Sequence, residues 1–108
     1  TEELSERLAE YGNAAFVVTV AVGGAPKVVH VPVVWDGEVI RCTPGGGTLA
    51  NLATSAPVTL VFPPPGPGAF SMLLDGDGLA DGEVAVITLT GAVLHRPAPE
   101  QPGDEINC

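Results

Sequence analysis

One strand-like segment, Lys27 to Trp35, constrains the fold most strongly because it is apolar on both of its faces. Successive side chains of a β-strand point to opposite faces of the sheet. One face of this segment carries Val28, His30, Pro32 and Val34, and the other carries Val29, Val31, Val33 and Trp35. A small closed barrel buries only its inner face, so the outer face needs a covering helix or a second subunit. The pattern therefore predicts a homodimer.

The rest of the chain predicts a mainly β fold with short helices. Leu4, Leu8 and Tyr11 recur at helical spacing and indicate a helix over 2–11. Runs rich in β-branched residues indicate strands over 15–22, 27–35, 38–42, 57–62, 69–74 and 83–93. A second helix is expected over 48–55, with Thr48 as its N-cap. The Asp- and Gly-rich residues 75–82 are expected to form a hairpin turn.

The length of 108 residues predicts a single domain over 1–97, followed by a Pro-rich, acidic tail over 98–108. Four Lys and Arg against 13 Asp and Glu give a net charge of -9, so we expect neither nucleic acid nor a membrane as a partner. The sequence shows neither an apolar run of membrane-spanning length nor a signal-peptide pattern. We therefore expect a cytoplasmic protein whose Cys42 and Cys108 are free thiols, with a disulfide between them as the alternative.

Two further patterns bear on possible chemistry. Residues 75–82 suggest a calcium loop, but Ala80 stands where an EF-hand has its glycine and Val86 where it has its bidentate Glu. His30 and His95 are the two histidines, and neither catalytic nor metal-ligand spacing joins them. We therefore expect no metal site. His95 is expected to form a surface or interface hydrogen bond, whereas His30 is either a hydrogen-bonded core side chain or a ligand contact.

The glycine run Gly45 to Gly47 lies between a predicted strand and a predicted helix. Glycines without Cβ atoms let backbone N–H groups approach an anion, and the helix dipole adds partial positive charge. Thr48 and Asn51 offer a hydroxyl and an amide as further donors. The run by itself predicts either a phosphate-binding corner or an ordinary turn from strand to helix.

The order of these segments resembles the pyridoxamine 5'-phosphate oxidase-like family over about residues 5–97. The resemblance is carried by the Gly-Gly-Ala-Pro turn at 23–26, the Trp-Asp-Gly at 35–37, the strand and glycine turn at 39–47, and the Ala-Pro-Val-Thr-Leu-Val-Phe at 56–62. It implies a split β-barrel of about six antiparallel strands, of the FMN-binding type. Members of this family are typically homodimers that hold FMN, or in some branches the deazaflavin F420, at the subunit interface.

The resemblance also implies where the cofactor lies. It places His30, Val31, Pro32 and Val33 near the flavin ring, Cys42 and Thr43 near the ribityl-phosphate, and Gly47, Thr48 and Asn51 at the phosphate corner. The chain departs from the family at this corner. Where the oxidases have a Ser-Arg-Lys type of grip, this chain has Gly47, Thr48 and Leu49, and the position that often supplies another basic residue is Val28. Lys27, Arg41 or a residue of the partner subunit is the candidate replacement.

The predicted function is therefore an oxidoreductase that binds FMN, or alternatively F420 or no cofactor, and acts on an unknown small molecule. The alternative function is a non-catalytic split-barrel binding module that has lost the basic phosphate grip. We do not expect oxidation of pyridoxamine phosphate, because an acidic chain with four Lys and Arg has too few basic residues to hold two phosphates.

Overall fold

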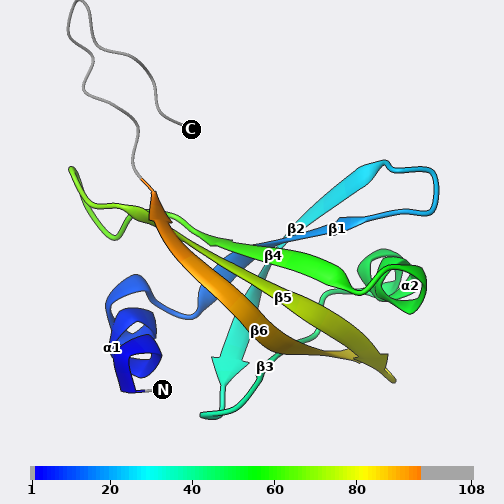
Figure 1. Cartoon of the computed structure of the whole chain (residues 1–108), viewed down its shortest axis with the longest axis horizontal. Helices are drawn as coiled ribbons and strands as arrows, with labels where there is room; N and C mark the ends of the chain where they lie inside the picture. The colour runs from blue at the N-terminus through cyan, green and yellow to red at the C-terminus, as the bar shows by residue number, and fades with distance from the viewer. Residues whose placement is uncertain (1, 96–108) are drawn as a thin grey trace, which may run out of the picture.

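A computed structural model describes residues 2–95 of the chain, and these residues form a six-stranded barrel with two helices (Figure 1). The elements are α1 (Glu2–Tyr11), β1 (Ala14–Val20), β2 (Pro26–Trp35), β3 (Ile40–Cys42), α2 (Gly46–Thr54), β4 (Pro57–Phe62), β5 (Ser71–Asp81) and β6 (Val84–His95). All neighbouring strands pair antiparallel, and the barrel closes in the order β1-β2-β3-β6-β5-β4. The predicted fold class, a mainly β split barrel of about six antiparallel strands, is confirmed.

The barrel interior is filled by one alternate set of side chains from each strand. Its buried apolar residues include Val17 of β1, Ile40 of β3, Leu60 and Phe62 of β4, Leu74 of β5 and Ile87 of β6. β2 contributes Val33, with Val29, Val31 and Trp35 packed against the same core. The opposite face of β2 is exposed: 56% of Val28 and 64% of Val34 are accessible. The strand thus carries an apolar outer face that nothing in the described chain covers, and the predicted homodimer remains a prediction.

The expected turn over 75–82 is wrong for most of its length, because residues 75–81 form the second half of β5, which ends at Asp81. Gly76 and Gly78 serve close packing rather than chain reversal. A Cβ on Gly76 would lie 2.6 Å from the Thr88 carbonyl oxygen, and a Cβ on Gly78 would lie 2.7 Å from Leu52 Cδ2. The chain reverses instead at Gly82, whose φ of 63° favours glycine. A β-bulge between Asp75 and Gly76 adjusts the register of the long β5–β6 hairpin.

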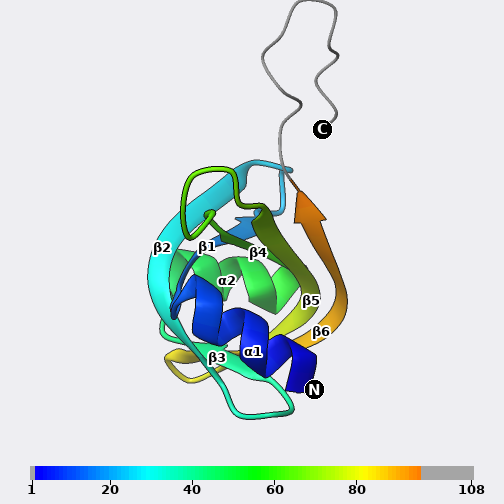
Figure 2. The same cartoon turned by 90° about the vertical axis from the view of Figure 1, so that its left-hand side faces the viewer.

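The two helices lie at opposite ends of the barrel. Figure 2 shows α1 crossing one opening with α2 behind it. The predicted α1 is confirmed, and it is joined to the barrel by hydrogen bonds from the Tyr11 hydroxyl to the Phe70 carbonyl (2.6 Å) and from Trp35 Nε1 to Ser5 Oγ (3.2 Å). Helix α2 begins two residues earlier than expected, at Gly46.

The prediction that Thr48 caps α2 is wrong. The N-cap is Gly45, whose φ of 95° is a conformation that favours glycine, and it makes no side-chain cap hydrogen bond. Thr48 lies in the helix with its side chain fully buried, and its hydroxyl has no hydrogen-bond partner among residues 2–95. The start of the helix is therefore set by the backbone conformation of Gly45 and not by a capping side chain.

No helix among the described residues is long and apolar enough to cross a membrane. Cys42 is a buried free thiol. Cys108 and the predicted tail over 98–108 lie outside the described residues.

Candidate functional site

The first turn of α2 presents backbone donors without a side-chain acceptor. The first helical hydrogen bond runs from the Leu49 amide to the Gly45 carbonyl over 3.2 Å. The N–H groups of Gly46, Gly47 and Thr48 precede this bond and have no acceptor within the helix. Because no capping side chain satisfies them either, these amides and the positive end of the helix dipole are available to an anion.

Lys27 lies directly over this turn. A Cβ on Gly47 would lie 2.8 Å from Lys27 Cε and 3.2 Å from Lys27 Nζ, so any larger residue at position 47 would displace the end of the lysine side chain from this turn. Lys27 is opposite Thr19 in the β1–β2 pairing, and Thr19 points into the barrel. Lys27 thus continues the inner face of β2 to the end of the barrel that α2 covers. Within residues 2–95 it takes part in no ion pair, which leaves its ammonium group available to an anion.

Arg41 is held by Asp36, in the turn between β2 and β3. Its guanidinium donates to the Asp36 carboxylate, which also accepts the backbone N–H groups of Glu38 (2.8 Å) and Val39 (2.9 Å). These bonds, led by the one from Val39 and followed by those from Arg41 and Glu38, lower the pKa of Asp36 to about 2. Arg41 therefore stabilises the turn between β2 and β3, and of the two basic residues considered from the sequence, only Lys27 reaches the glycine corner.

A groove of about 440 Å³ lies beside β2 and β3. It is lined by Pro32, Val34, Arg41, Cys42, Thr43 and Val84, so it unites three of the residues predicted to contact a cofactor. Its volume falls in the range of small-molecule sites, about 300 to 1,000 Å³. Burial raises the pKa of the Cys42 thiol, so Cys42 contributes a small neutral group. Thr43 lines this groove two residues before Gly45, so the chain itself connects the groove to the corner.

The predicted site residues differ in their exposure to solvent. His30, Pro32, Thr43 and Gly47 are exposed, whereas Val33, Cys42 and Thr48 are buried and Val31 and Asn51 are half-buried. Asn51 donates from Nδ2 to Thr19 Oγ1 over 3.1 Å, so its amide anchors α2 to β1.

His30 lies on the outer surface, where its ring stacks on Phe16 with centroids 4.3 Å apart and planes 14° from parallel. The interpretation of His30 as a core side chain is therefore wrong. Strand pairing continues this position across the sheet in the row His30, Phe16, Val61, Leu73 and Val93. Sequence reasoning missed Phe16, although a hairpin turn at 21–25 fixes it opposite His30.

Comparisons with known proteins identify the fold but no close relative. No protein-family model matches the sequence, and no curated protein matches it. Among solved structures, an F420 reductase superposes with a TM-score of 0.67 at 18% identity, covering 82% of this chain and 94% of that chain. HupZ from Group A Streptococcus gives 0.67 at 14% identity, covering 87% and 92%, and HutZ, the heme storage protein of Vibrio cholerae, gives 0.63 at 14%, covering 86% and 92%. The chain shares the split-barrel fold of these proteins.

Proposed function

We propose that this chain is a pyridoxamine 5'-phosphate oxidase-like split barrel that binds a flavin or deazaflavin nucleotide and acts as an oxidoreductase on a small molecule. Lys27 over Gly47, beside the uncapped amides of α2, is the observation that carries the proposal. A phosphate at this corner receives backbone hydrogen bonds and one charge-assisted contact. The F420 reductase among the structural neighbours supports a deazaflavin, and FMN is the related alternative.

The residues present fit such a cofactor in a consistent order. Lys27 and Gly47 would hold the phosphate, Cys42 and Thr43 in the groove would contact the ribityl chain, and Pro32 on the outer face of β2 would contact the ring. A bound flavin or deazaflavin supplies the redox chemistry, while the chain holds its phosphate and orients its ring.

A second copy of the chain completes the site in this proposal. The outer face of β2 is both apolar and exposed, at 56% for Val28 and 64% for Val34, and a partner seated there covers it together with the cofactor ring. Sedimentation velocity tests this step: the wild-type chain sediments as a dimer, and Val34→Glu shifts it to a monomer. A wild-type chain that stays monomeric at 100 μM contradicts the homodimer.

Absorbance titration tests the cofactor itself. The purified chain is titrated with FMN and, separately, with F420, and the ring absorbance and fluorescence are followed to saturation. We expect saturation at micromolar concentration with at least one of the two. If neither cofactor binds at about 100 μM, the oxidoreductase proposal is to be abandoned.

The stacked pair Phe16 and His30 supports a second candidate, a non-catalytic binding module for a planar apolar ring. HutZ, a heme storage protein, shares the fold, and an exposed imidazole is a common ligand for heme iron. In this case hemin titration produces a Soret band that His30→Ala abolishes and Phe16→Leu weakens. A Soret shift that is the same in wild type and His30→Ala contradicts this role of His30.

A further inference from the structure

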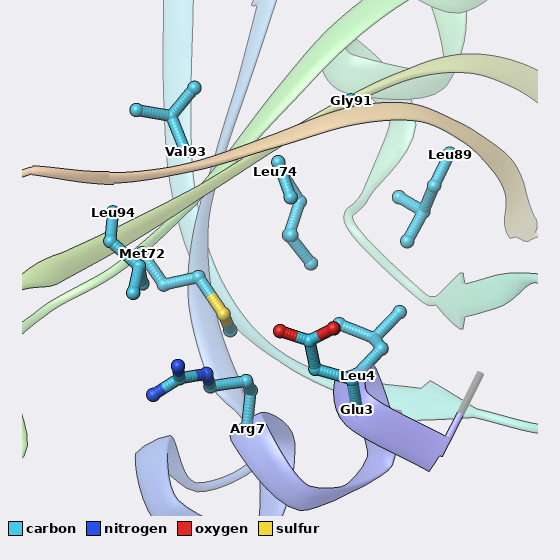
Figure 3. Close-up of a pocket in the computed structure, with 10 residues that line it drawn as sticks. Glu3, Leu4, Arg7, Met72, Leu74, Leu89, Gly91, Val93 and Leu94 are labelled. Atoms are coloured by element: carbon cyan, nitrogen blue, oxygen red, sulfur yellow. The ribbon is translucent and has the colours of Figure 1, made fainter.

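A second cavity, of about 380 Å³, lies at the end of the barrel opposite α2. It opens between α1 and the β5–β6 hairpin (Figure 3). No part of the proposed nucleotide site lines it. The cavity was not expected from the sequence, because it depends on how α1 crosses the barrel opening.

The floor of this cavity is apolar, and part of it belongs to the barrel core. Met72 and Leu74 of β5 belong to the barrel core, with 2% and 0% of their surfaces exposed, and Leu89 and Leu94 of β6 line the cavity beside them. These side chains offer no hydrogen-bond donor, and methionine adapts readily to different ligand shapes. The floor therefore favours hydrocarbon over polar groups.

The mouth of the cavity carries one charge of each sign. Glu3 and Arg7 are four residues apart in α1, so they lie on one face of the helix, and Figure 3 shows both side chains beside the cavity. Among the described residues, Arg7 has an ion pair with Glu10 at 3.9 Å, a long distance between two side chains that are about half exposed. A cationic head group is attracted by Glu3 but repelled by Arg7. An anionic head group is attracted by Arg7 but repelled by Glu3. A neutral hydroxyl or carbonyl can bond to either side chain without repulsion.

From this arrangement we propose that the cavity binds a small apolar molecule with a neutral hydroxyl or carbonyl end. Its volume lies near the lower limit for small-molecule sites, so the ligand is of the size of a medium-chain alcohol or ketone. The site is separate from the proposed nucleotide corner, and binding here is independent of FMN or F420. This is a second binding function for the barrel, beyond the proposed oxidoreductase activity.

The test uses 1-hexanol, 1-octanol and 1-decanol as probes, with displacement of the fluorophore N-phenyl-1-naphthylamine as the readout. Burial of each methylene raises affinity about fourfold, so two more carbons tighten binding by about 15-fold until the cavity is filled. Octanoate and octylamine bind no more tightly than 1-octanol. A flat dependence on chain length overturns the proposal, as does a tenfold preference for either charged probe.

A matched pair of variants locates the binding. Ala92 is opposite Leu74 in the β5–β6 pairing and lines the cavity, whereas Thr88 is an exposed residue of the same strand outside it. Ala92→Phe lowers 1-octanol affinity at least tenfold, and Thr88→Phe leaves it within twofold. Equal affinities in wild type and a folded Ala92→Phe overturn the assignment.

Two further measurements keep the proposal testable if Ala92→Phe does not fold. Intermolecular nuclear Overhauser effects in the wild type connect 1-octanol to the Met72 methyl group, and their absence at saturating 1-octanol overturns the site. In the second measurement, we expect the dissociation constant of the probe to stay the same when it is determined at increasing protein concentrations. A loss of binding on self-association shows that a second copy covers the cavity, and overturns the small-molecule proposal.

Discussion

Replacing Lys27 by Met tests the phosphate corner most directly. Methionine keeps the length and apolar contact of the lysine side chain over Gly47 but removes the ammonium group. A hydrogen bond to a charged group contributes about 1.5 to 3 kcal/mol. Because Lys27 is exposed, solvent screening places its effect near the lower end, about 1.5 kcal/mol, which is roughly tenfold in affinity.

The assay compares two ligands that differ only in the phosphate. FMN and riboflavin share the ring and the ribityl chain, so titrating both against wild type and Lys27→Met isolates the pairing of Lys27 with the phosphate. We expect FMN to bind about tenfold more weakly to the variant and riboflavin to change by less than twofold.

Arg7→Met is the matched control, because it removes one positive charge at the opposite end of the barrel. It lowers the net charge equally and leaves FMN affinity unchanged, which separates a local contact from the long-range effect of charge. The reasoning is refuted if Lys27→Met weakens riboflavin as much as FMN, or leaves FMN affinity unchanged. Circular dichroism and thermal melting establish that the variants remain folded.

Three stability predictions follow from the same structure. Gly76→Ala places a methyl group 2.6 Å from the Thr88 carbonyl oxygen and lowers the free energy of unfolding in urea by about 1 to 3 kcal/mol. Gly91→Ala, whose methyl group meets nothing within 4 Å, changes this free energy by less than about 0.5 kcal/mol. Equal effects of the two substitutions would contradict the close contact at Gly76. Thr48→Val removes a buried, unpartnered hydroxyl and raises the free energy of unfolding by about 1 kcal/mol, so a loss of stability would reveal a hidden partner. The pKa of Asp36 falls from 3.8 to about 2 on folding, so its stabilisation is present above pH 3.8 and is lost as the pH falls toward 2; the stability difference between wild type and Asp36→Asn should shrink across that window, and a constant difference would sink the argument.

The sequence predicts the barrel because its strands carry a strong alternating pattern. The prediction is wrong where glycine can serve either a turn or a close contact within a strand. Gly76 and Gly78 lie in an Asp-Gly-Asp-Gly run that is typical of turns. In the structure they make room for the Thr88 carbonyl and for Leu52. Both uses select the residue without a Cβ, so local composition does not separate them. The difference lies in contacts between segments far apart in the chain, which appear only once β5, β6 and α2 are packed together.

The sequence predicts where the glycine corner lies, but not which basic side chain lies beside it. The run Gly45 to Gly47 marks the start of α2 in the sequence, yet the basic residue beside it comes from β2, whose Lys27 reaches Gly47 because the β1–β2 register sets it opposite Thr19. The same Thr19 accepts the hydrogen bond from Asn51 that joins α2 to β1. One position of β1 therefore lies beside the lysine and also anchors the helix whose first-turn amides lack a capping side chain. Under the proposed function, Asn51→Ala should weaken FMN binding more than riboflavin binding, because it removes the hydrogen bond that holds α2 against β1.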